Sequence, residues 1–180
     1  MKNKYNLALM PMTINDEVVK LSHVFSDLAD KYILNEKSLP HVTLCQFEIE
    51  DDEIDSIWNK VCEQWREDPI DLMFEEFSCL TFDNHIYWVS LLPNNVDALH
   101  EMHGKITNII NQPAKKLFDP HMTLINTKNT EYEMSVDQYS SSYKPVRDKF
   151  ILKLGRCDGV GQFTEVIYTY EPRAKSICRI

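Results

Sequence analysis

The sequence lacks a long apolar segment. After Met1-Lys2-Asn3-Lys4 the chain enters a short, strand-like apolar run, and no cleavage-site pattern follows it. We therefore expect no signal peptide and no membrane span. Linkers, low-complexity tracts and blocks of like charge are also missing, so we expect the 180 residues to form a single two-lobed domain, residues 1–180.

The sequence contains fewer basic than acidic residues. The chain has 19 Lys and Arg residues against 28 Asp and Glu residues, which gives a formal net charge of −9 at pH 7. Proteins that grip many phosphates of a long nucleic acid usually present a basic face. The composition therefore disfavours long RNA or DNA as a partner. A small nucleotide or a short RNA end stays open, because a few local cations suffice to bind it.

Closely spaced cysteines are missing as well. The five cysteines are odd in number and lie far apart along the chain: Cys45, Cys62, Cys79, Cys157 and Cys178. This pattern is typical of reduced thiols rather than of a disulfide framework. We expect a cytoplasmic protein. The sequence does not decide the oligomeric state, for which a monomer is the default.

The chain does contain one five-residue pattern in two copies. Residues 40–44 read Pro-His-Val-Thr-Leu, and residues 120–124 read Pro-His-Met-Thr-Leu. Alternate side chains of a strand share a face, so the His and Thr of each copy should point one way and the apolar residues the other. A lone His-x-Thr is common on a half-buried strand. Two copies, each beginning with Pro, indicate an internal repeat.

The surroundings of the motif repeat too. Pro11 ends an apolar strand and precedes His41 by 30 positions, while Pro93 ends another and precedes His121 by 28. A helical pattern fills both intervals. The unit strand–helix–strand therefore occurs twice, in residues 5–49 and 86–128. We expect two pseudo-symmetric halves, with His41 and His121 facing one groove from adjacent central strands.

Periodicity predicts the remaining elements. Apolar residues three and four apart indicate helices over residues 15–32, 51–65 and 95–110. Strands are predicted at residues 70–82, 85–92, 150–154 and 166–170, with a tight turn at Asp83-Asn84 between the first two. Residues 129–145 are polar and predict a surface loop, in which one helical turn could form.

Two imidazoles that face one groove can divide acid and base duties. Imidazole titrates near neutral pH, so one ring can accept a proton while the other donates one. The hydroxyls of Thr43 and Thr123 can each donate a hydrogen bond to an oxygen of an anion held between them. This arrangement suits displacement at a phosphodiester, in which one histidine activates the attacking hydroxyl or water and the other protonates the leaving oxygen. Such chemistry needs no metal, because hydroxyls and a histidinium can stabilise the anionic transition state.

The paired motifs inside duplicated strand–helix–strand units resemble the two-histidine (2H) phosphoesterase superfamily, which includes RNA 2′,5′-ligase-like proteins and cyclic nucleotide phosphodiesterases. The resemblance covers about residues 5–170. It implies a bilobal α+β fold with antiparallel sheets around a central groove, His41 and His121 as the catalytic pair, and Thr43 and Thr123 as phosphate-binding residues. The implied activity is hydrolysis, without metal or cofactor, of 2′,3′-cyclic phosphates or 2′,5′-phosphodiester bonds in nucleotides or short RNA ends, with RNA ligation as the reverse reaction.

Two alternatives concern the same groove. Cys45 follows Thr43 by two positions, so it should share the groove-facing side and could complete a zinc site with His41 and His121. The threonines and the repeat have no role in such a site, which makes it the weaker interpretation. The groove could also bind a nucleotide or an RNA end without turning it over. A turnover assay separates this binding module from the enzyme.

Two other groups of residues remain without a role. His100 and His103 lie one helical turn apart and could bind a metal, although one buried and one partly exposed residue is the commoner arrangement. Four cations near the end of the chain could supply a charge for a second phosphate, and the sequence does not choose among them: Arg147, Lys149, Lys153 and Arg156.

Overall fold

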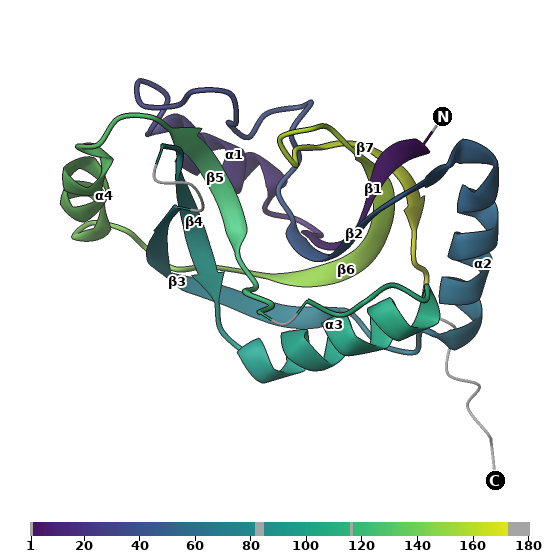
Figure 1. The fold of residues 1–180 in the computed structure, drawn as a ribbon. Coiled ribbons are helices and arrows are strands. Elements are labelled where there is room, and N and C mark those ends of the chain that lie inside the picture. Colours follow the sequence, from purple (N-terminus) through teal and green to yellow (C-terminus); the bar gives the residue numbers. More distant parts are fainter. Residues whose placement is uncertain (1, 82–84, 116, 173–180) are drawn as a thin grey trace, which may run out of the picture.

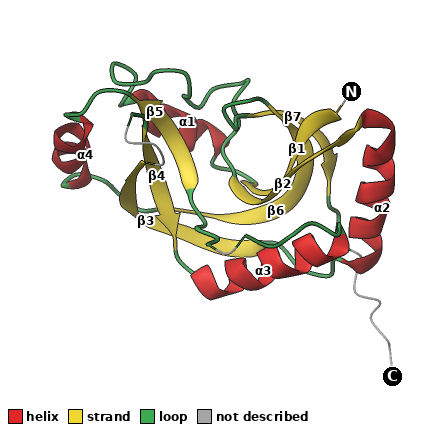
Figure 2. Cartoon of the chain, in the orientation of Figure 1, coloured by secondary structure: helices red, strands yellow, loops and turns green. Residues whose placement is uncertain are grey.

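The computed structural model describes residues 2–81, 85–115 and 117–172 (Figure 1). In these ranges the strands are β1 (Lys2–Pro11), β2 (Val42–Glu50), β3 (Ile70–Thr81), β4 (Tyr87–Pro93), β5 (Met122–Thr127), β6 (Val146–Cys157) and β7 (Phe163–Thr169). The α-helices are α1 (Asn15–His23), α2 (Ile54–Gln64), α3 (Val96–Ile109) and α4 (Tyr132–Ser140), and a short 3-10 helix, Asp51–Glu53, precedes α2 (Figure 2). None of these helices is both long enough and apolar enough to cross a membrane.

The strands form one antiparallel sheet in the order β2-β1-β6-β3-β4-β5, and β7 pairs with β6 outside this order. Strand β6 joins the two halves, because its first residues pair with β3 and its later residues pair with β1. The predicted bilobal α+β fold with antiparallel strands is confirmed. The two expected sheets are the two halves of this one curved sheet (Figure 1).

Both predicted strand–helix–strand units are present, as β1-α1-β2 and β4-α3-β5. Each helix packs on a strand of the other unit: α1 lies against β5, and α3 lies against β2. Each half of the molecule therefore combines the strands of one repeat with the helix of the other. This exchange locks the two halves together.

One face of the sheet is continuous from β2 to β5. Residues directly opposite each other on paired strands point to the same side of the sheet. A bulge at Glu75 shifts the pairing of β3 with β4 by one residue. With this shift taken into account, the strand pairs place ten residues on one face: Thr43, Ala8, Lys153, Lys149, Asp71, Met73, Glu76, Ser78, Ser90 and Thr123. We call this the inner face of the sheet. The residues between them point to the opposite, outer face.

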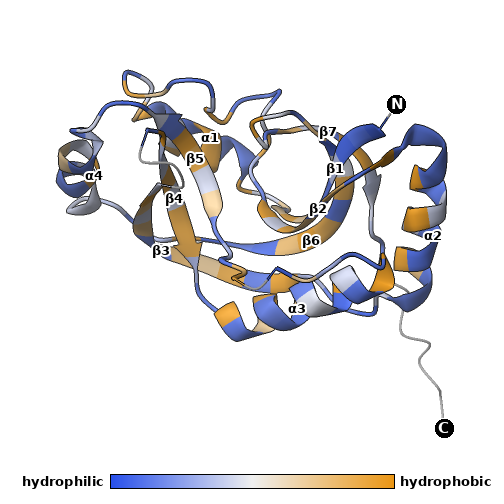
Figure 3. Cartoon of the chain, viewed as in Figure 1, coloured by the Kyte–Doolittle hydropathy of each residue, from blue (hydrophilic) through white to orange (hydrophobic). Residues whose placement is uncertain are grey.

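The hydrophobic core lies between the outer face and the helices. On β7, Tyr168 stacks on Trp58 of α2, with ring centroids 5.3 Å apart. On β3, Phe77 packs edge-on against Tyr139 of α4, at 6.1 Å. Figure 3 shows the matching pattern on α2 and α3, where apolar and polar residues alternate along each helix as expected for one buried side.

The two motif strands contain the same irregularity. Leu7 pairs with Cys45 but its neighbour Ala8 pairs with Thr43, so Leu44 is an extra residue in β2. In β5, Leu124 is the extra residue in the same way, because Val89 pairs with Ile125 and Ser90 with Thr123. A bulge of this kind reverses the alternation of faces beyond it and often re-aims side chains next to a functional site.

The prediction that the motif strands are adjacent and central is wrong. β2 and β5 stand at opposite ends of the strand order, and they come together only because the sheet curves strongly. Antiparallel sheets twist and coil by nature, so the ends of a long sheet can approach each other. The free edge of β5 is covered by the chain before β2: Asp30 N–H donates to Asn126 O at 2.8 Å, and Asn126 N–H donates to Tyr32 O at 3.0 Å.

Other elements differ from the prediction as well. Strand β6 (Val146–Cys157) is much longer than the strand predicted at residues 150–154. Helix α1 ends at His23, and the apolar residues that follow it are packed in successive turns. The side chains of Ser22 and His23 both contact the carbonyl of Leu34, where the chain returns toward the helix end. The loop predicted at residues 129–145 contains α4, whose buried residues Tyr132 and Val136 lie one turn apart. The expected turn at Asp83-Asn84 falls outside the described residues.

Candidate active site

Thr43 and Thr123 lie on the inner face, one at each end of the sheet. His41 and His121 precede them by two positions, directly before the first residues of β2 and β5. The two histidines are close enough that the charge of His121 affects the pKa of His41. Strands β2 and β5 also contact each other, so the two motif segments meet across the curve of the sheet.

Both histidines are held by the same local hydrogen bond. Nδ1 of His41 lies 2.8 Å from the carbonyl oxygen of Leu39, and Nδ1 of His121 lies 2.8 Å from that of Asp119. A carbonyl oxygen only accepts, so each Nδ1 carries the proton and donates it. Nε2 is then left as the reactive nitrogen of each ring. The proline between each pair of partners fixes the backbone of this turn.

The two rings differ in their surroundings. His41 is 7% exposed, and burial lowers its pKa to about 4; the charge of His121 acts in the same direction, while the Leu39 carbonyl opposes it. His41 is therefore neutral near pH 7. The side chain of His121 is 28% exposed, and its Nδ1 lies 3.7 Å from the carboxylate of Asp119.

The threonine hydroxyls are each contacted by a polar side chain of the neighbouring strand. Asn6 Nδ2 donates to Thr43 Oγ1 at 3.0 Å, and Ser90 Oγ lies 3.4 Å from Thr123 Oγ1. Asn6 is fully buried, and its Oδ1 has no hydrogen-bond partner among the described residues. Sequence reasoning missed both residues. The available signal was a polar residue inside the apolar run of each first strand.

Phe163 of β7 forms the wall beside His41. The two ring centroids are 5.4 Å apart, and Phe163 also packs against Ala8 and Met10 of β1. This close approach depends on Gly155 of β6. A Cβ atom there would lie 2.3 Å from the Phe163 ring and 2.0 Å from the carbonyl oxygen of Glu165. No larger residue fits without moving β7.

Comparison with known proteins places the chain in a family. A family model described as the 2′-5′ RNA ligase superfamily matches residues 26–150, which is more than half of the chain. The protein belongs to the 2′-5′ RNA ligase superfamily. The resemblance to two-histidine phosphoesterases seen in the twin motifs is thereby confirmed.

Solved structures show the same fold. E. coli LigT complexed with 3′-AMP superposes with a TM-score of 0.63 at 11% identity, covering 95% of this chain and 97% of that chain. E. coli LigT complexed with ATP gives a TM-score of 0.57 at 11% identity, covering 94% and 98%. A crystal structure described as a phosphoesterase gives 0.56 at 12% identity, also covering 94% and 98%. A comparison with curated protein sequences gave no match.

In this superfamily member, Cys45 does not belong to the site. Cys45 pairs with Leu7, which points to the outer face, because the bulge at Leu44 reverses the alternation beyond Thr43. The expectation that Cys45 shares the groove-facing side is therefore wrong. Burial raises the pKa of its thiol to about 11. The proposed zinc site of His41, Cys45 and His121 cannot form from this arrangement, and the described residues contain no cluster of three or more metal-ligating side chains.

His103 is also not a metal ligand. Its Nδ1 donates to the carbonyl of Leu44 at 2.6 Å, and its Nε2 accepts from the backbone N–H of Lys115 at 3.1 Å, so both nitrogens are occupied. The ring stacks on Phe118 with centroids 4.2 Å apart, whereas His100 contacts that ring edge-on. His103 thus connects the bulge of the first motif strand to the loop that leads into His121.

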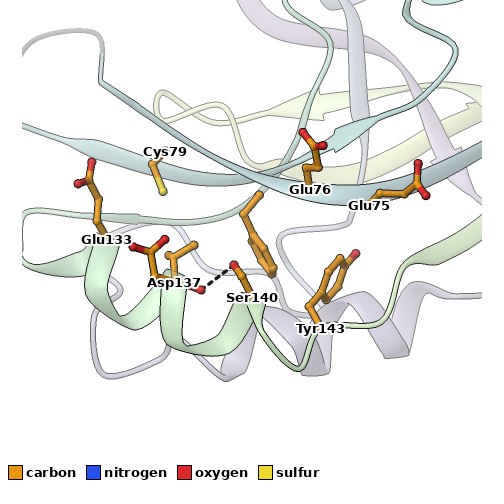
Figure 4. A pocket seen from close by; sticks show the side chains of 9 residues that line it. Glu75, Glu76, Cys79, Glu133, Asp137, Ser140 and Tyr143 are labelled. Atoms are coloured by element: carbon orange, nitrogen blue, oxygen red, sulfur yellow. Dashed lines mark hydrogen bonds between the residues drawn. The ribbon is translucent and has the colours of Figure 1, made fainter.

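A cavity of about 500 Å³ lies away from the histidines, between β3 and α4 (Figure 4). Phe77 and Cys79 line the cavity from the outer face of the sheet. Cys79 pairs with Val89, which lies on the opposite face from its neighbour Ser90, a residue of the inner face. The cavity lining includes the carboxylates of Glu75, Glu133 and Asp137, and at its rim that of Glu76 from the inner face. An acidic lining repels an anionic substrate, so this cavity does not compete with the inner face as the site for phosphate chemistry.

Proposed function

We propose that this protein is a metal-independent phosphodiesterase that acts on 2′,3′-cyclic phosphates or 2′,5′-phosphodiester bonds of nucleotides or short RNA ends. One observation carries the proposal. His41 and His121 approach each other from opposite ends of the sheet, each with Nδ1 donating to a backbone carbonyl and a threonine hydroxyl two positions on. Membership of the 2′-5′ RNA ligase superfamily supports the same reaction class.

The roles of the two histidines follow from their surroundings. Buried His41 is neutral near pH 7, so its Nε2 can accept the proton of the attacking water. His121 is the more exposed ring and lies beside the Asp119 carboxylate, so we assign it the proton donated to the leaving ribose oxygen. The P–O bond to that ribose oxygen breaks as the water oxygen bonds to phosphorus. Each role is typically worth about 10²–10⁴ in rate. When a ribose 5′-hydroxyl takes the place of the attacking water on a 2′,3′-cyclic phosphate, the same proton transfers break the P–O3′ bond and form a 2′,5′-phosphodiester, with no water consumed or released.

The threonines bind the phosphate in this proposal. Asn6 Nδ2 occupies a lone pair of Thr43 Oγ1, so the Thr43 hydroxyl is free to donate its own proton to a non-bridging oxygen. Thr123 supplies the matching donor from the other end of the sheet. Two such donors stabilise the charge that develops on the phosphate oxygens in the transition state.

The substrate is small, and we place the reaction in the cytoplasm. A net charge of −9 is unfavourable for gripping many phosphates of a long RNA. The two LigT structures are complexes with 3′-AMP and with ATP. Because the present protein has a similar fold, these complexes support a nucleotide-sized ligand for it as well. Cys45, Cys79 and Cys157 form no disulfide bond with any described residue, as is usual in a reducing compartment.

A turnover assay tests the proposal. The panel contains nucleoside 2′,3′-cyclic phosphates, 2′,5′-linked dinucleotides and, as a control, 3′,5′-linked dinucleotides, each with the wild-type protein and with His41→Ala. We expect hydrolysis of at least one of the first two classes by the wild-type protein only. Binding of these ligands without any turnover would show a nucleotide-binding module, and the enzymatic proposal would fail.

A further inference from the structure

The structure distinguishes among the four cations that the sequence left without a role, because two of them are already paired with acidic residues. Arg147 forms an ion pair with Asp71 at 2.7 Å, and Arg156 pairs with Asp51 at 2.9 Å and with Glu165 at 3.4 Å. These two guanidinium groups are therefore already paired. The side-chain ammonium groups of Lys149 and Lys153 form no hydrogen bond or ion pair with any described residue.

Lys153 lies on the inner face, close to the first motif. Its partner on β1 is Ala8, and the partner of Ala8 on β2 is Thr43. Neighbouring strands are spaced about 4.8 Å apart, so the backbone of Lys153 lies roughly 10 Å from that of Thr43. A lysine side chain is long and flexible enough for its ammonium to reach an anion beside the one that Thr43 binds.

The surroundings of Lys153 are unusual for a lysine. The side chain is half-buried, and burial lowers its pKa, with no acidic residue contributing to the shift. Withdrawing an ammonium from water without a partner is unfavourable. Lys149, four positions earlier on the same face, is exposed and lies near the Asp71 carboxylate. Among the four cations, Lys153 is thus the one with no anion beside it in the described part of the chain.

We infer that Lys153 binds a second phosphate of the substrate, adjacent to the one that lies between His41 and His121. The inference rests on the proposed function and makes it more specific. The preferred substrate carries at least two phosphates, as a short RNA end does and a mononucleoside 2′,3′-cyclic phosphate does not. Lys153 acts on affinity and specificity, and takes no part in proton transfer.

Equilibrium binding tests the inference without requiring turnover. The probes are a nucleoside 3′-monophosphate and the matching nucleoside 3′,5′-bisphosphate, titrated calorimetrically at constant ionic strength. We expect the wild-type protein to bind the bisphosphate about tenfold more tightly or better, as for one charge-assisted hydrogen bond. Lys153→Met should abolish this preference and leave the Kd of the monophosphate within twofold. Lys153→Arg, which keeps the charge, should retain most of it.

Two matched controls remove a charge elsewhere. Lys60→Met changes an exposed lysine of α2, and Lys149→Met changes the exposed lysine on the inner face. Both should keep the preference for the bisphosphate. The inference is overturned if the wild-type protein binds both probes equally, or if Lys153→Met weakens both to the same extent. If the Lys153-dependent preference is present but no substrate is hydrolysed, the proposed function fails and the second phosphate site stands.

Discussion

The side-chain amide of Asn6 donates a hydrogen bond to the hydroxyl oxygen of Thr43, at 3.0 Å, from the strand next to the first motif. Because the amide is the donor, the Thr43 proton must point elsewhere, and the inner face is where an anion would receive it. Asn6 is thus a positioning residue for the proposed phosphate-binding hydroxyl. No pattern in the sequence assigns it that role.

Substitution of Asn6 tests this relationship. Asn6→Ala removes one hydrogen bond and should lower kcat/KM by roughly tenfold or less, equivalent to about 1 kcal/mol. Asn6→Asp should cost at least another factor of ten, because a carboxylate would accept the Thr43 proton and repel the phosphate. Both variants are compared after thermal unfolding confirms that they are folded. An Asn6→Asp variant as active as Asn6→Ala would show that the direction of this hydrogen bond is irrelevant.

The buried state of His41 predicts a specific acid sensitivity. An unfolded histidine has a pKa of about 6.5, and burial in the folded protein lowers that of His41 to about 4. Between these values the unfolded chain binds more protons, so the free energy of unfolding falls as the pH falls from 6.5 to 4, by up to roughly 3 kcal/mol. Urea unfolding at pH 7, 5.5 and 4.5 measures this loss. The free energy of unfolding of His41→Gln should fall less over the same pH range. Equal losses in the wild-type protein and the variant would contradict the lowered pKa of His41.

His103 should stabilise both motif segments at once. His103→Phe keeps the stacking on Phe118 but leaves the Leu44 carbonyl and the Lys115 N–H without their partner. An unsatisfied buried group costs about 1–3 kcal/mol, so we expect a clear drop in Tm and, since the loop before His121 is released, in kcat/KM. The control is His100→Phe, at an exposed neighbouring position, which should change stability by less than about 0.5 kcal/mol. Equal Tm values for the two variants would remove His103 from this role.

The repeat made the architecture predictable and singled out the four proposed site residues. Two copies of one pattern, each after a strand ending in Pro, specify two related units and place His41 with His121 and Thr43 with Thr123. This information is carried by the spacing of a few residues. The spacing predicts the two units correctly even though each helix packs on a strand of the other unit.

What the sequence could not predict depends on pairing between distant strands. The bulge at Leu44 is created by the register of β2 against β1, and it turns Cys45 to the outer face. Similarly, Asn6 acquires its role only because it lies beside Thr43 across two strands. The placement of β2 and β5 at opposite ends of a curved sheet is likewise a property of the whole strand order. Local periodicity contains none of this.

The central claim is that catalysis depends on both His41 and His121. If His41 is the base and His121 the acid, the reaction needs the first neutral and the second protonated. The plot of log kcat/KM against pH is then bell-shaped, with two apparent values that belong to the pair. Loss of the base should abolish the acidic limb, and loss of the acid should abolish the alkaline limb.

The most direct measurement is therefore kcat/KM against pH for the wild-type protein, His41→Ala, His121→Ala and the double variant, with a 2′,3′-cyclic nucleotide or 2′,5′-linked dinucleotide in the presence of EDTA. We predict a metal-independent bell for the wild-type protein and a loss of about 10² or more for each single variant. The double variant should lose far less than the product of the two, because the residues act as a unit. Single variants within tenfold of the wild-type rate, or activity that EDTA removes and zinc restores, would contradict the two-histidine mechanism.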